Sequence, residues 1–248
     1  MTEDTKPSRR DFMATAAAGA GSLALAAAAS AATPGDAATA TPISLAPAFQ
    51  ASDKLKPLAF DPARLSGLSE RLIRSHWENN YGGSVKALAV VKKRLGEALG
   101  DKDLPPYIYN DLKREHLLRT GSVVLHDHYF DNLGGSGKAG AAERQTIAQA
   151  FGSFDAWETE FRKIAAGLGG GSGWVVLGFN HHLRQLENFW LADHAHGPAA
   201  TTPILVMDMY EHAYQMDFGA AAAKYIDAFF QNLQWDAVAA RIAALPKA

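Results

Sequence analysis

The sequence of 248 residues contains no cysteine. This absence excludes disulfide bonds, thiolate nucleophiles and the zinc or iron-sulfur sites that depend on cysteine ligands. A metal site in this chain must therefore be built from histidine and carboxylate side chains, which suit iron, manganese or zinc.

The sequence also lacks an excess of either charge. It has 24 Lys and Arg against 26 Asp and Glu, a formal net charge of -2. A nucleic-acid-binding protein usually carries a basic footprint, so we expect no nucleic-acid partner. The hydrophobic content of 48% is enough for a buried core, and the length indicates one or two domains.

No apolar run long enough for a transmembrane helix follows residue 31. The first 31 residues have the pattern of a signal peptide: Arg9 and Arg10 precede an uncharged Ala-rich run that ends in Ala29-Ser30-Ala31. We expect a twin-arginine signal, recognition by the twin-arginine export machinery, cleavage after Ala31, a periplasmic location and no stable membrane association after cleavage. An uncleaved membrane anchor is the alternative.

Residues 32–57 have the composition of a linker. Helical spacing of apolar residues then predicts a helix over 61–99 and another over 107–130, separated by the breaker GDKDLPP and followed by a glycine-rich stop. A short polar loop between two long helices indicates an antiparallel hairpin. The core positions expected on the first helix are Leu68, Leu72, Val85, Leu88, Val91 and Leu95.

The remainder changes from helical to strand patterns and back. Two shorter helices are expected in residues 141–168, the second capped by Ser153 or Asp155. Residues 174–179 and 185–191 read as a β-hairpin, and ILVMDMYEHAY begins as a third strand before turning helical. With a helical C-terminal segment, this order predicts an α+β fold with an antiparallel sheet surrounded by helices. The predicted domains are 58–137, a helical hairpin, and 138–248, an α/β domain.

Several histidines are placed where they could bind a metal. His76 lies within the first helix, and His126 and His128 lie near the end of the second. Asp208 and His212 flank the strand-to-helix junction in DMYEH, and because they are four residues apart, both would project from one face of a helical turn. Each signal is weak by itself, because a single histidine on a helix is more often a core or surface residue than a ligand.

The order of motifs resembles one known family. DMYEHAYQMDF is similar to the D-x-W-E-H-A-Y signature of the iron/manganese superoxide dismutases, and KYIDAFFQNLQWDAVAARI resembles that family's C-terminal tail. FGSFDAWETEF, GSGWVVL and VVLHDHYFDNLGG match three further strings in the same order. The resemblance extends from about residue 58 to the C-terminus. It implies superoxide as the substrate, which is converted to O₂ and H₂O₂.

The resemblance implies one iron or manganese ion per subunit, held by His76, His126, Asp208 and His212. His128 is a rival to His126, because the two side chains lie about 200° apart on a helix and cannot share a site. In the family the ligand precedes the motif leucine by seven residues, so Leu133 selects His126. The three-histidine, one-carboxylate set accepts either metal, and zinc is excluded as the working ion because it has no redox chemistry.

The resemblance also implies a hydrogen-bond partner for solvent at the metal. The family commonly uses a glutamine, either on the second helix or in the loop after the hairpin. Ser122 stands at the first position here, and the loop offers His194 or, as the rival, His196. We expect His194 to be this partner.

Further site residues follow from the same resemblance. Trp174, Phe130 and Tyr210 are expected to wall the pocket, although plain core packing would account for the same residues. Glu211 matches the glutamate that orients a ligand histidine of the other subunit. This match implies a homodimer in which His212 is held across a two-fold axis.

The chain departs from the family at the entrance to the site. Without gaps, Asn80 and Ser84 occupy the positions four and eight residues after His76, where relatives usually carry a gate His and Tyr. Tyr81 would lie about 140° round an α-helix from His76 and is not expected to replace the lost Tyr. Gln215 replaces an interface Tyr, and an amide hydrogen bond between Asn80 and Gln215 across the dimer is expected. These changes leave an alternative open, a metal-binding superoxide dismutase-like protein with little or no turnover.

Overall fold

The structure, a computed structural model, describes residues 45–246. The predicted signal peptide, its cleavage site and the first part of the predicted linker lie outside these residues. Among the described residues, no helix has both the length and the apolar character that a membrane span requires.

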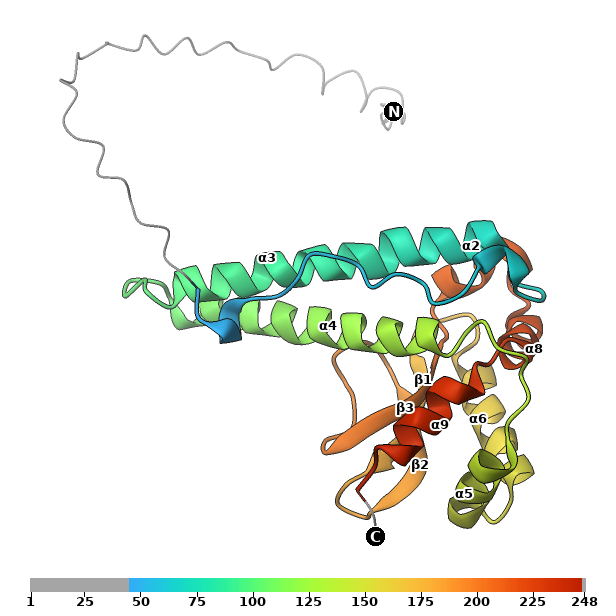
Figure 1. The fold of residues 1–248 in the computed structure, drawn as a ribbon. Helices are drawn as coiled ribbons and strands as arrows, with labels where there is room; N and C mark the ends of the chain where they lie inside the picture. Colours follow the sequence, from blue (N-terminus) through green and yellow to red (C-terminus); the bar gives the residue numbers. More distant parts are fainter. Residues whose placement is uncertain (1–44, 247–248) are drawn as a thin grey trace, which may run out of the picture. The chain divides into compact units, whose positions relative to one another are not determined.

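The N-terminal half is an antiparallel pair of long helices (Figure 1). The first is assembled from α2 (Glu70–Ser75), a π-helical turn η3 (His76–Tyr81) and α3 (Gly82–Ala98), and the second is α4 (Pro106–Asp131). The expectation of a helix from residue 61 was wrong. A 3-10 turn, η2 (Pro62–Arg64), stands there, and α2 begins after Ser69, whose side chain caps it by accepting a hydrogen bond from Leu72 N–H.

The segment before α2 lies along the helical pair (Figure 1). It contains a 3-10 turn, η1 (Pro47–Phe49). Lys56 contacts both sides of the π-helical turn: its N–H donates to the Tyr81 hydroxyl at 3.1 Å, and its carbonyl accepts from the Trp77 indole at 3.0 Å. Its ammonium group lies 2.6 Å from an Asp131 carboxylate oxygen on α4. Part of the predicted linker is thereby attached to both helices.

The C-terminal half contains α5 (Ala141–Phe151), α6 (Phe154–Leu168) and a three-stranded antiparallel sheet. Ser153 caps α6 by accepting from Ala156 N–H. The strands are β1 (Trp174–Asn180), β2 (Gln185–Leu191) and β3 (Thr201–Asp208), in the order β2-β1-β3. The α+β class and the helical hairpin are as the sequence predicts. The third strand begins at Thr201, three residues before the predicted start at Ile204.

After β3 the chain forms η4 (Glu211–Ala213), α7 (Gln215–Phe218), α8 (Ala222–Gln231) and α9 (Trp235–Ala243). The C-terminal segment is helical, as spacing predicts, and it is divided into the two helices α8 and α9. Asn232 separates them, because its side-chain oxygen accepts from Ser66 N–H and its amide donates to Ser66 O.

One core joins the two halves, since α4 of the N-terminal half packs against β3 of the C-terminal half. Within the C-terminal half, α6 packs against β1 and β2. Of the six core positions predicted on the first helix, Leu68, Leu72, Val85, Val91 and Leu95 are buried, and Leu88 is partly exposed. This packing places the C-terminal end of β3 beside η3 and the last turns of α4.

Candidate metal centre

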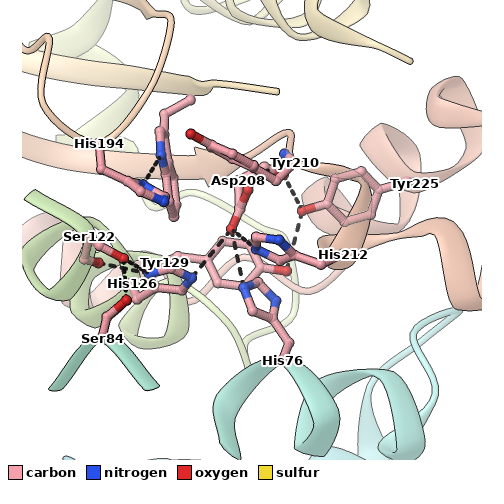
Figure 2. A network of polar contacts seen from close by, with 11 residues as sticks. His76, Ser84, Ser122, His126, Tyr129, His194, Asp208, Tyr210, His212 and Tyr225 are labelled. Atoms are coloured by element: carbon pink, nitrogen blue, oxygen red, sulfur yellow. Dashed lines mark hydrogen bonds and ion pairs between the residues drawn. The ribbon is translucent and has the colours of Figure 1, made fainter. Parts of the chain in front are cut away.

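Three histidines and one aspartate converge where these elements meet (Figure 2). His76 is the first residue of η3, His126 lies on α4, Asp208 ends β3 and His212 lies in η4. One ligand atom from each residue lies within 4.8 Å of the other three. Two atoms that each lie about 2.1 Å from one ion are at most roughly 4.2 Å apart, so the cluster fits a single metal ion after small shifts.

The carboxylate of Asp208 is at the centre of the cluster. Its Oδ2 lies 3.1 Å from His76 Nε2, 3.7 Å from His126 Nε2 and 3.2 Å from His212 Nε2. The Nε2 atoms of His76 and His126 are buried and make no hydrogen bond within residues 45–246. Buried polar atoms are normally paired, so unpaired imidazole nitrogens that face one carboxylate indicate a cation site.

The aspartate is fixed by its neighbours. Asp208 Oδ1 accepts a hydrogen bond from Tyr210 N–H at 2.8 Å, which leaves Oδ2 to face the histidines. The backbone carbonyl of Asp208 accepts from the buried Tyr225 hydroxyl at 2.6 Å, and the Tyr129 hydroxyl lies 3.3 Å from that of Tyr225. Sequence reasoning missed both tyrosines.

Burial and charge favour metal-binding protonation states. Burial lowers the pKa of His76 and lowers the pKa of His126 to about 3, so both imidazoles are neutral at neutral pH. Burial alone would raise the pKa of Asp208. The hydrogen bond and charge of His212, followed by the close approach of His76, outweigh this effect and hold the pKa of Asp208 well below its usual range.

The two loop histidines occupy different environments. His194 Nδ1 accepts a hydrogen bond from the Trp174 indole N–H at 2.9 Å, and its ring lies 5.9 Å from the His126 ring. His196 instead contacts Asp193, with Nδ1 2.8 Å from a carboxylate oxygen, and its side chain is 75% exposed. The structure therefore brings His194, and not His196, to the cluster.

Aromatic rings surround the ligands, as the sequence predicts. Trp174 lies 5.0 Å from His126, Phe130 lies 5.0 Å from His76 and Tyr210 lies 5.3 Å from His212, measured between ring centroids. Tyr129 lies 5.1 Å from His76 and was not predicted. Its position three residues after His126 places it on a neighbouring helical face, which could have identified it.

Comparison with known proteins agrees with a metal centre of three histidines and one aspartate. Residues 139–241 match the family described as iron/manganese superoxide dismutases, C-terminal domain. The chain is 49% identical over 191 residues to a "Superoxide dismutase [Fe]" of Cupriavidus metallidurans, covering 77% of this chain and 96% of that protein. The chain belongs to the iron/manganese superoxide dismutase family.

Relatives named for each metal occur in this superoxide dismutase family. A "Superoxide dismutase [Fe]" of Aquifex aeolicus is 33% identical, over 80% of this chain and 93% of its own. A "Superoxide dismutase [Mn] 2" of Haloferax volcanii is 32% identical, over 77% of this chain and 95% of its own. Both metals thus occur among relatives that align along nearly their whole length.

Asp208 and His212 flank the end of the third strand of this dismutase fold, as expected: Asp208 ends β3 and His212 follows in a 3-10 turn. The structure corrects one local expectation. The angle given for Tyr81 assumed an α-helix, whereas residues 76–81 form a π-helix with roughly one turn between i and i+5. Tyr81 is buried with its ring 6.1 Å from His126, although its hydroxyl accepts from Lys56 N–H.

The other predicted site residues of this superoxide dismutase fold differ in their burial. Glu211 and Gln215 are exposed, and Asn80 is partly buried. Ser84 is buried, with its hydroxyl 2.8 Å from that of Ser122 on α4. His128 is not part of the cluster of ligand atoms, and its Nδ1 lies 2.8 Å from the Val124 carbonyl.

Proposed function

We propose that the protein disproportionates superoxide with iron or manganese bound by His76, His126, Asp208 and His212. The observation that carries this proposal is the convergence of four ligand atoms within 4.8 Å around buried, unpaired imidazole nitrogens. When bound, the metal supplies one-electron cycling, by which one superoxide is oxidised to O₂ and a second is reduced, with two protons, to H₂O₂.

The protein supplies a site of defined charge. Neutral His76 and His126, with the Asp208 carboxylate, leave a bound divalent or trivalent cation with net positive charge, which attracts an anionic substrate. The rings of Trp174, Phe130 and Tyr210 exclude bulk water and strengthen these electrostatic interactions.

His194 is the hydrogen-bond donor of the centre. Its Nδ1 accepts from Trp174, so Nε2 carries the proton in the neutral imidazole and can only donate. The Tyr210 ring stacks on His194 at 4.8 Å and 14°, which restricts ring rotation. Nε2–H therefore donates to solvent or to a reduced oxygen species in the site.

The role of His194 is tested by His194→Ala, with His196→Ala as the matched loop control. We expect the first variant to lower turnover and to shift the reduction potential of the loaded protein, and the second to change neither. Full activity and an unchanged potential in His194→Ala would remove this assignment.

The metal centre is completed by a second copy of the chain. The His212 side chain is 26% exposed in a single chain, and Glu211, Gln215 and Met216 are exposed beside it. A homodimer that covers this surface places Glu211 of each copy against the ligand His212 of the other, and brings Asn80 near Gln215. Exposed apolar surface such as Met216 is then buried.

Sedimentation of Glu211→Ala tests the dimer, with Glu97→Ala at the far end of α3 as the control. We expect Glu211→Ala to shift the equilibrium towards monomer and to weaken metal retention, whereas Glu97→Ala leaves both unchanged. A wild-type protein that sediments as a monomer at micromolar concentration would end the proposal, as would a dimer structure in which Asn80 and Gln215 are far apart.

Residues 1–31 direct the protein to the periplasm by the twin-arginine route. The support is the sequence SRRDFM followed by an uncharged, weakly apolar run. The double variant Arg9→Lys/Arg10→Lys is expected to retain the precursor in the cytoplasm, whereas Lys6→Gln is expected to be exported normally. Periplasmic recovery of the double variant would contradict this route.

The activity is tested on purified protein loaded separately with iron and manganese. We expect at least one form to consume superoxide, with one ion per chain by elemental analysis. If both forms bind metal and neither consumes superoxide, the alternative holds, namely a metal-binding protein of this fold whose changes at Asn80 and Ser84 have removed turnover.

A further inference from the structure

Two buried serine hydroxyls join the long helices behind the metal ligands (Figure 2). Ser84 of α3 is 5% exposed and Ser122 of α4 is 1% exposed, and their Oγ atoms are 2.8 Å apart. Buried hydroxyls need partners, and each of these serines satisfies the other. The side chain of Ser84 is therefore directed to α4.

Ser122 makes two contacts with the ligand His126. The Ser122 carbonyl lies 2.7 Å from His126 Nδ1, and the Ser122 hydroxyl lies 3.3 Å from the same atom. A carbonyl can only accept, so Nδ1 carries the proton and Nε2 keeps its lone pair for the metal. By contrast, Nδ1 of His76 makes no hydrogen bond within the described residues.

The direction of this hydrogen-bond chain follows from the tautomer. His126 Nδ1–H is shared between the Ser122 carbonyl and the Ser122 hydroxyl oxygen. The hydroxyl oxygen thus accepts from His126, and its own proton is available to the Ser84 oxygen at 2.8 Å. Donation from Ser122 to Ser84 strengthens Ser122 as an acceptor, because hydrogen bonds in a chain polarise one another.

We propose that Ser84 and Ser122 form a positioning pair that holds the His126 ring and increases its basicity as a ligand. The inference rests on the proposed function in that His126 is taken as a metal ligand. It assigns Ser84 a position behind the ligand. A more basic imidazole favours the more highly charged metal, so the pair lowers the reduction potential of the centre.

The test measures metal affinity and reduction potential, which do not depend on turnover. The variants are Ser122→Ala, Ser84→Ala, their double, and Ser122→Thr, which keeps the hydroxyl. Affinity for manganese is measured by chelator competition and the potential by mediated redox titration. Thr146→Ala on α5 is the control, because it removes a hydrogen-bonded helix hydroxyl, 3.0 Å from the Ala142 carbonyl, that lies outside the ligand cluster.

We expect Ser122→Ala to weaken metal binding about tenfold, the low end for loss of a ligand's hydrogen-bond partner, because the Ser122 carbonyl remains. Ser84→Ala is expected to weaken it less. Since Ser84 acts through Ser122, the double variant should match Ser122→Ala. The potential should rise in all three, and Ser122→Thr and Thr146→Ala should match the wild type.

The inference is overturned if Ser122→Ala keeps wild-type affinity and potential, or if the double variant loses the product of the two single losses. Circular dichroism of the metal-free proteins shows which variants fold, and if Ser122→Ala does not, Ser84→Ala and Ser122→Thr decide. A wild-type protein that binds metal but consumes no superoxide would end the proposed activity and leave these affinity ratios unaffected.

Discussion

Replacement of Gly121 by alanine tests how the loop that carries His194 is seated. Gly121 lies on α4, and a Cβ atom there would stand 1.7 Å from the His194 carbonyl oxygen and 2.8 Å from its carbonyl carbon. Real Cβ atoms essentially never approach closer than 3.0 Å, so the carbonyl must retreat by at least about 1.3 Å. Backbone of the loop and backbone of the helix meet directly, so no flexible side chain can absorb the change.

The cost of Gly121→Ala follows from this displacement. Overpacking costs about 1 to 3 kcal/mol, and if the loop moves, the buried Trp174 indole loses its acceptor on His194, at about 1 to 3 kcal/mol. The higher helix propensity of alanine offsets roughly 1 kcal/mol. We therefore expect a net loss of about 3 kcal/mol in the free energy of unfolding. Turnover should fall by up to about 100-fold, because His194 is displaced by more than 1 Å.

Urea unfolding of the metal-free protein measures the stability term without the contribution of metal binding. The matched control is Gly167→Ala on α6, where an added Cβ meets no atom within 4 Å. That variant should be as stable as the wild type or more stable by up to roughly 1 kcal/mol. If Gly121→Ala unfolds at the wild-type urea concentration and keeps full activity, the close seating of His194 on α4 is refuted.

Two further predictions concern the ligands and their support. His126→Ala should abolish retention of metal after desalting, whereas His128→Ala should retain one ion per chain, because His128 lies outside the cluster; equal metal contents by elemental analysis would contradict the ligand assignment. Tyr225→Phe removes a buried 2.6 Å hydrogen bond to the Asp208 carbonyl and should lower the free energy of unfolding by about 1 to 3 kcal/mol. Wild-type thermal stability in Tyr225→Phe would show that this bond contributes nothing.

The fold was predictable wherever one hydrophobic period persisted. The helical hairpin and the β-hairpin follow from spacing alone, since each buries one regular face. The start of β3 was not predictable in this way, because a proline such as Pro203 usually indicates the end of a strand. Proline is tolerated there because β3 is an edge strand and Pro203 faces Gly178, where the register with β1 shifts.

The four metal ligands could be predicted from the order of motifs in the sequence, whereas the residues that hold those ligands in place could not. Asp208 and His212 meet because a strand end and a 3-10 turn bring their side chains together, a geometry that a spacing of four does not specify. Contacts such as Tyr225 with the Asp208 carbonyl join residues 17 positions apart through tertiary packing. The break at Asn232 likewise depends on its bonds to Ser66, 166 positions away.

The stretch HWENNYGG is unfavourable as an α-helix, and the π-helical turn explains its residues. The Gly82 N–H reaches the Trp77 carbonyl, five residues back, and the Asn79 side chain donates to the Ser75 carbonyl at 3.0 Å. Gly82 leaves room for Leu55, whose Cδ2 would lie 2.9 Å from an added Cβ. Asparagine and glycine thus supply the polar partner and the close approach that this turn requires.

The wider turn also changes which residues face α4. It lets Tyr81 pack beside His126 while Ser84, at the start of α3, still reaches Ser122. If residues 76–81 had formed an α-helix, the side chains after His76 would be rotated about the helix axis, relative to α4, by nearly the angle between two successive residues. The low α-helix propensity of this stretch is therefore offset, because the π-helical turn places His76, Tyr81 and Ser84 against α4. A local departure from helical rules at a ligand is where function, and not folding alone, constrains the sequence.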